Sequence, residues 1–196
     1  PLIGALGTFD ALYYTLPASN TIRADAKANF STIMTSPEWR KWADETVRCL
    51  TVSGYPRTRM LYQELANEIW NFAHPFWWST NYFWGFGDAL GSKGPSYGLG
   101  YASAHYAVQL DLALKEKGMA DQAWTIVLAG QMANTSTTQG AVDGFKRYFA
   151  DKGIDPAPFL KRAGLSTASY YGHGQMFSKT SGLINAVDDT AHKTAW

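Results

Sequence analysis

The sequence lacks the features that mark several classes of protein. Its 196 residues include a single cysteine, Cys49, so no disulfide forms within the chain. The strongly apolar windows, such as residues 76–86, are interrupted by Asn81 and Gly85 and fall short of the roughly 20 residues that cross a bilayer. The 17 Lys and Arg balance 16 Asp and Glu, and no basic run occurs that would neutralise a line of phosphates. We therefore expect no transmembrane helix and no nucleic-acid partner.

Spacing-defined cofactor motifs are also missing. No cysteine pattern accompanies the four dispersed histidines, which are His74, His105, His173 and His192. The run Gly172-His173-Gly174-Gln175 has neither phosphate-loop nor dinucleotide spacing, and no Gly-x-Ser-x-Gly elbow is present. We expect no metal and no cofactor, with His105 as a satisfied core group and His173 as a functional candidate.

The chain is instead apolar and rich in aromatic rings. Hydrophobic residues make up 46%, charged residues 17% and aromatic residues 15%, including 8 Trp. A chain of this length buries a substantial core, so we expect one domain over residues 1–196. Such a density of rings suits a core, an interface or a cleft that stacks on sugars.

Hydrophobic periodicity and capping signals divide the chain into alternating elements. Ser36 and Pro37 open a helix whose apolar stripe includes Cys49, here interpreted as a structural thiol. Residues 69–99, with their glycines and prolines, are interpreted as a long aromatic loop or broken helix. Predicted helices cover residues 36–52, 101–118, 140–152 and 156–163. Predicted strands cover residues 59–68 (with a helix as the rival interpretation), 124–130 and 165–171, with a further candidate within 3–14.

This alternation is typical of an α/β protein with a parallel sheet. Long crossovers between the strands favour a (β/α)8 barrel of the TIM type, which usually takes about 250 residues. Since too few strands are found, we expect an incomplete or shortened barrel. The start at Pro1, without Met or a basic segment, indicates a processed terminus or a cut piece.

The candidate site follows the predicted strand 59–68. Asn67 and Glu68 end this strand, and catalytic groups of such barrels lie at the carboxyl ends of strands. A general acid must retain its proton near neutral pH, and an apolar wall favours the protonated form. Trp70, Trp77 and Trp78 follow closely and supply both a wall and a stacking surface for a sugar ring.

The run Glu64-Leu65-Ala66-Asn67-Glu68-Ile69-Trp70-Asn71 resembles the fourth-strand signature of the clan A glycoside hydrolases. It is most similar to poorly characterised bacterial members that read Glu-x-x-Asn-Glu-x-Trp-Asn. The resemblance implies that Glu68 is the acid/base, that Asn67 binds a sugar 2-hydroxyl, and that Tyr170, Tyr171 or His173 line the cleft. It also implies a β-linked polysaccharide or oligosaccharide as substrate, and an extracellular or periplasmic location.

The family's second carboxylate, a Glu on the seventh strand, has no counterpart, because no glutamate follows Glu116. Glu64 is placed roughly 13 Å down a straight strand from Glu68, too far to act with it. It is interpreted as a structural carboxylate bonded to backbone groups or to arginine, with Arg57 and Arg59 as candidates.

Two alternatives follow from this gap. The chain is either hydrolytic with a second carboxylate supplied elsewhere, or a non-catalytic carbohydrate-binding or assembly protein. A homo-oligomer or a partner chain that completes the sheet is a further expectation, since exposed strand edges need cover.

Overall fold

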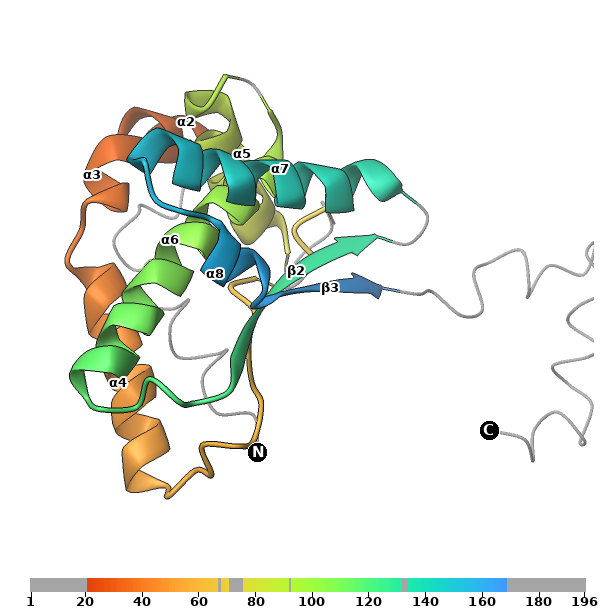
Figure 1. The fold of residues 1–196 in the computed structure, drawn as a ribbon. Coiled ribbons are helices and arrows are strands. Elements are labelled where there is room, and N and C mark those ends of the chain that lie inside the picture. Colours follow the sequence, from red (N-terminus) through yellow and green to blue (C-terminus); the bar gives the residue numbers. More distant parts are fainter. Residues whose placement is uncertain (1–20, 67, 71–75, 92, 132–133, 169–196) are drawn as a thin grey trace, which may run out of the picture.

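The computed structural model describes residues 21–66, 68–70, 76–91, 93–131 and 134–168, drawn in colour in Figure 1. Helices and strands follow one another in this part in the order α2 (Ile22–Ala28), α3 (Phe30–Met34), α4 (Glu38–Val52), β1 (Leu61–Gln63), α5 (Trp77–Ala89), α6 (Pro95–Glu116), β2 (Trp124–Gln131), α7 (Thr135–Lys152), α8 (Ala157–Leu160) and β3 (Ala163–Ala168). The predicted alternation of helices and strands is thus observed. The strand predicted within residues 3–14 lies outside the described residues.

The three strands form one parallel sheet in the order β1-β2-β3. Leu61 is paired with Trp124, and Ala163 with Ile126, so both neighbours of β2 run in its direction. Within the described residues, β1 and β3 each keep one unpaired edge, and the sheet does not close. The prediction of a (β/α)8 barrel, even a shortened one, is therefore wrong. Alternating strands and helices specify a parallel sheet, but they do not specify whether it closes.

One face of β2 carries the core. Trp124, Ile126 and Leu128 are buried at alternate positions, as expected for side chains that point to the same face of a strand. Helices α6 and α7 pack against each other and both contact β2 (Figure 1). Because β1 and β2 are parallel, the carboxyl end of β1 and the amino end of β2 lie at opposite ends of the sheet.

The helix predicted from residue 36 is observed as α4, but it begins at Glu38, with Pro37 in place of Ser36 as the N-cap. The Ser36 hydroxyl accepts a hydrogen bond from the Glu38 N–H at 3.3 Å. The buried face is formed by Trp39, Trp42, Ala43, Thr46, Val47 and Leu50. Cys49, expected on this face, is only half-buried and lies beside Glu45 and Arg48.

Of the two interpretations given for residues 69–99, the broken helix is the one observed in the described part, which contains α5 and the start of α6. Gly91 and Gly94 have positive φ values between the two helices, whereas Gly85, Gly87 and Gly98 allow close helix packing. A Cβ on Gly98 would lie 2.0 Å from the Phe83 carbonyl oxygen, so only glycine lets α6 approach α5 this closely. Helix α5 itself carries aromatic side chains on most of its faces, so its sequence does not show the apolar stripe that usually predicts a helix.

No helix in the described part is long and apolar enough to cross a membrane. Strand β1 has only three residues, far fewer than the predicted 59–68. The chain bends at Leu65 and turns at Ile69 and Trp70, so Glu68 lies in a loop beyond the strand.

Candidate functional site

The backbone of Glu68 adopts a left-handed conformation just beyond the carboxyl end of β1. Its φ is 48°, and no other non-glycine residue in the described part has a positive φ. For an L-residue with a Cβ this conformation costs about 1–2 kcal/mol. Such strain persists only where the surrounding structure fixes it, and it concentrates at functional sites.

Buried neighbours fix this loop on both sides. Leu65, Ala66 and Ile69 are all buried, with Ile69 fully enclosed in the core. Glu68 itself is half-buried. The loop is thus anchored by apolar side chains, with Glu68 between them only half-buried.

A buried polar network ties β1 to two helices immediately before this loop. The Tyr106 hydroxyl of α6 donates to Oε1 of Gln63 at 3.1 Å, and lies 3.0 Å from the Thr46 hydroxyl of α4. Burial raises the pKa of Tyr106 to about 12, so its hydroxyl keeps the proton that it donates. Sequence reasoning missed this network, since its three residues are far apart in the chain.

Glu64 lacks the partners expected for it. The side chain is half-buried, and burial raises the pKa of its carboxyl. Arg57 pairs instead with Asp121 at 2.6 Å, and the Arg59 guanidinium lies 5.7 Å from the centre of the Tyr55 ring. Within the described residues, no hydrogen bond or ion pair of the Glu64 side chain is found.

The separation assigned to Glu64 and Glu68 also needs correction. The figure of roughly 13 Å assumes a straight strand from one residue to the other. The strand ends at Gln63, the chain bends at Leu65, and Glu68 has a positive φ. The argument that excluded Glu64 as a second carboxylate therefore does not apply.

The expected stacking residues are half-buried and pack against the core from two segments. Trp70 lies in the turn after Glu68, whereas Trp77 and Trp78 form the first turn of α5. The Trp77 and Trp78 rings meet edge to face, with centroids 5.1 Å apart at 89°. Each ring is thus held in place while part of it remains exposed.

The structure brings Glu68 and Trp70 together on one loop. The other predicted site residues, Asn67, Tyr171 and His173, lie outside the described residues. Within the described residues, no group of three or more His, Cys, Asp or Glu side chains is arranged to hold a metal ion.

His105 is a core residue, as predicted. It is 9% exposed, and its Nδ1 lies 2.9 Å from the Tyr148 hydroxyl. Desolvation by burial, aided by the positive charge of Lys152, lowers its pKa to about 4. The imidazole is therefore neutral near pH 7 and serves packing.

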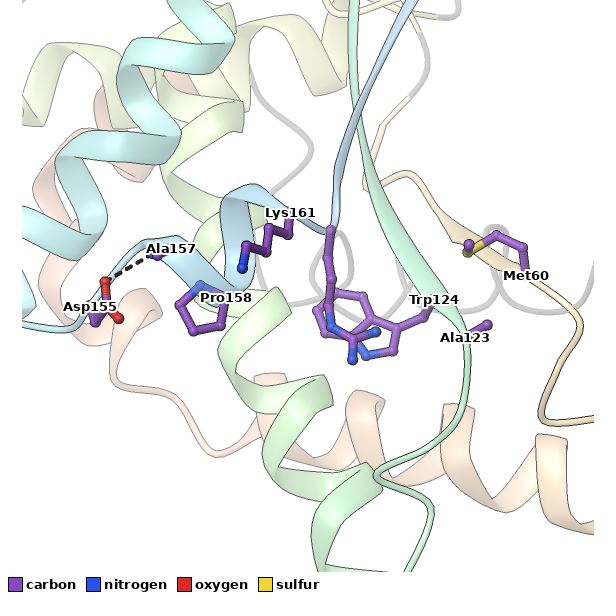
Figure 2. Close-up of a pocket in the computed structure, with 8 residues that line it drawn as sticks. Met60, Ala123, Trp124, Asp155, Ala157, Pro158 and Lys161 are labelled. Atoms are coloured by element: carbon purple, nitrogen blue, oxygen red, sulfur yellow. Dashed lines mark hydrogen bonds between the residues drawn. The ribbon is translucent and has the colours of Figure 1, made fainter.

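A hollow of about 640 Å³ lies at the other end of the sheet, where β2 begins (Figure 2). Its lining residues are Met60, Ala123, Trp124, Asp155, Ala157, Pro158, Lys161 and Arg162. They come from the approach to β1, the start of β2 and the segment around α8. The sequence did not predict this hollow, because its segments are far apart in the chain and meet only through the pairing of the strands.

Comparison of the chain with protein-family models, curated proteins and solved structures found no match.

Proposed function

We propose that this chain acts on a β-linked polysaccharide or oligosaccharide by general acid/base catalysis, with Glu68 as the proton donor. The observation that carries the proposal is the left-handed backbone of Glu68, held by buried neighbours directly after a parallel strand. The carboxyl ends of parallel strands are where open α/β sheets place their ligand sites. A strained backbone at a carboxylate residue beyond this strand end is consistent with selection for chemistry rather than for stability.

The proposed reaction begins with transfer of the Glu68 proton to the glycosidic oxygen as its bond to the sugar carbon breaks. Water completes the hydrolysis, either directly or after a second carboxylate has bonded to the sugar. Carboxyl groups about 5–5.5 Å apart give retention, and about 6.5–9.5 Å apart give inversion. Glu64 is the nearest glutamate in sequence, but burial raises the pKa of its carboxyl and so disfavours the ionised form that this second role needs.

Sugar contacts are assigned to the aromatic side chains that follow Glu68 in the chain. Trp70, Trp77 and Trp78 present partly exposed rings, which suit stacking against the apolar faces of sugars. The resemblance of the motif adds Asn67, Tyr171 and His173 to the proposed binding residues. A secreted location, extracellular or periplasmic, remains a prediction from the same resemblance.

Turnover of β-linked oligosaccharides tests the proposal. Released reducing ends are measured for the wild type, Glu68→Gln and the control Glu45→Gln, which changes a carboxylate paired with Arg48 on α4. Activity lost in Glu68→Gln and kept in Glu45→Gln supports the proposal. Equal turnover by the Glu68 variant and the wild type overturns it.

A carbohydrate-binding or assembly function without catalysis is the second candidate. The edge-to-face Trp77 and Trp78 pair favours it, because fixed, partly exposed rings bind sugars without needing a carboxylate pair. Titration of tryptophan fluorescence with the same oligosaccharides separates the two functions. Saturable binding without released reducing ends supports the binding function.

The open edges of β1 and β3 also motivate the predicted homo-oligomer or partner chain. The mass of the protein in solution, measured by sedimentation, distinguishes an assembly from a monomer.

A further inference from the structure

We infer that the hollow at the amino end of β2 binds a small organic carboxylate with a compact apolar body. The site is separate from the proposed sugar site, because Trp124 begins β2 whereas Glu68 follows the carboxyl end of parallel β1. Its volume of about 640 Å³ falls within the range of small-molecule sites. The two sites can thus be tested independently.

The side chains that line this hollow carry a net positive charge. Within the described residues, neither Lys161 nor Arg162 forms an ion pair. Asp155, the one carboxylate of the lining, accepts a hydrogen bond from the Ala157 N–H at 3.0 Å. Two cations against one anion suit a ligand with a single negative charge.

A second hollow, of about 600 Å³ along α4, provides a contrast. Its arginines, Arg40 and Arg48, are both paired with carboxylates of the chain. An anion entering there would compete with these existing ion pairs. The same competition is absent beside Lys161 and Arg162.

Arg162 is held in place before any ligand arrives. Its guanidinium carbon lies 4.9 Å from the centre of the buried Trp124 ring, which is labelled in Figure 2. Its backbone carbonyl accepts hydrogen bonds from the Ile126 N–H at 2.8 Å and the Thr125 hydroxyl at 2.7 Å. An ordered arginine loses less entropy on binding a carboxylate than a free one does.

The remaining lining selects for an apolar body. Met60, Ala123 and Pro158 contribute carbon surface, with Met60 41% exposed across the hollow from α8. Burying this surface against a hydrocarbon group adds to affinity in proportion to its area. A carboxylate joined to such a group meets both the cations and the apolar wall.

Benzoate is the probe, and benzyl alcohol is its neutral counterpart. Each is titrated into the full chain while backbone amide shifts are followed by ¹H–¹⁵N NMR. We expect saturable benzoate shifts at Ala157, Lys161 and Arg162, with affinity at least about tenfold above that of benzyl alcohol. Equal affinity for the two probes, or no saturable benzoate binding at millimolar concentrations, overturns the inference.

Variants locate the binding. Arg162→Gln is expected to weaken benzoate binding about tenfold, and Lys161→Gln severalfold, whereas Lys146→Gln on α7 leaves it unchanged. Lys161→Gln keeps the guanidinium on Trp124, so the test survives a folding defect in Arg162→Gln. An equal loss in Lys146→Gln indicates non-specific attraction and contradicts the site. Glu68→Gln is expected to bind benzoate normally, so a failure here is distinct from a failure of the proposed hydrolysis.

Discussion

The hydroxyl of Tyr106 donates a hydrogen bond to Oε1 of Gln63 at 3.1 Å, and so joins the middle of α6 to the last residue of β1. Both side chains are buried, and the Thr46 hydroxyl meets the same phenol from α4. The loop that carries Glu68 therefore begins from a strand end that is fixed by two helices.

Tyr106→Phe is expected to destabilise the protein by about 1–3 kcal/mol, because it leaves buried polar groups of Gln63 and Thr46 without a partner. Thermal unfolding should show a Tm lower by roughly 2–12 °C. Tyr62→Phe is the matched control, since Tyr62 lies on the same strand and is 68% exposed. Equal Tm values for both variants would show that the network contributes little.

Gly144→Ala tests the close contact of α6 and α7. A Cβ at this position would lie 2.0 Å from the Tyr97 carbonyl oxygen, so the helices must separate, at a cost of about 1–3 kcal/mol. Gly140→Ala in the same helix meets nothing nearer than 3.4 Å and should be neutral or gain up to about 1 kcal/mol of helix propensity. Denaturant unfolding of the two variants measures the difference, and a Gly144 variant as stable as the Gly140 variant would contradict the packing.

His105 makes stability depend on pH. The unfolded imidazole binds a proton near pH 6.5, whereas the folded one, desolvated in the core, binds it only near pH 4. The free energy of unfolding therefore falls as the pH drops from about 6.5 towards 4, by roughly 3 kcal/mol across that window.

Urea unfolding at pH 7 and pH 4.5 measures this loss for the wild type and for His105→Gln, which cannot titrate. The wild type should lose clearly more stability than the variant between the two pH values. Parallel losses would place the acid sensitivity in other groups.

The backbone strain at position 68 is isolated by comparing Glu68→Ala with Glu68→Gly. Both changes remove the carboxylate, but only glycine adopts a φ of 48° without steric cost. The glycine variant is expected to be more stable than the alanine variant by about 1 kcal/mol in equilibrium unfolding. A more stable alanine variant would show that the left-handed conformation is not kept.

Much of the fold could be predicted from local signals. Helix α4 has Ser36 and Pro37 directly before its first turn and a regular apolar stripe, and β2 has β-branched residues between turn formers. The spacing of apolar residues along each element predicts which of its side chains are buried. The closure of the sheet depends on contacts between distant segments, and the predicted barrel was wrong for that reason.

The region around α5 shows why a glycine in the sequence can wrongly predict a turn. Gly85 is a turn signal in isolation, yet a Cβ there would lie 2.4 Å from the Arg23 carbonyl oxygen of α2. The residue is needed because two helices approach, and that approach is a tertiary property. The hollow beside Arg162 was missed on similar grounds, since Met60 reaches it only through the pairing of β1 with β2.

The candidate site was predicted in part. The motif placed Glu68 at the end of a predicted strand, whereas the parallel strand β1 ends at Gln63 and Glu68 lies in the loop that follows. Nor did the motif reveal the positive φ of Glu68, or that Arg57 pairs with Asp121 rather than with Glu64. These features depend on how the loop packs against Ile69 and its neighbours.

The dependence of Glu68→Gln on leaving-group acidity tests the central claim most directly. A proton donor matters most where the leaving group is a poor one, because an activated phenolate departs without protonation. The kcat/KM of the variant on aryl β-glycosides should fall by about 10²–10⁴-fold with a poor leaving group, and far less with a nitrophenolate. A variant that cleaves both classes of substrate as fast as the wild type would contradict the account.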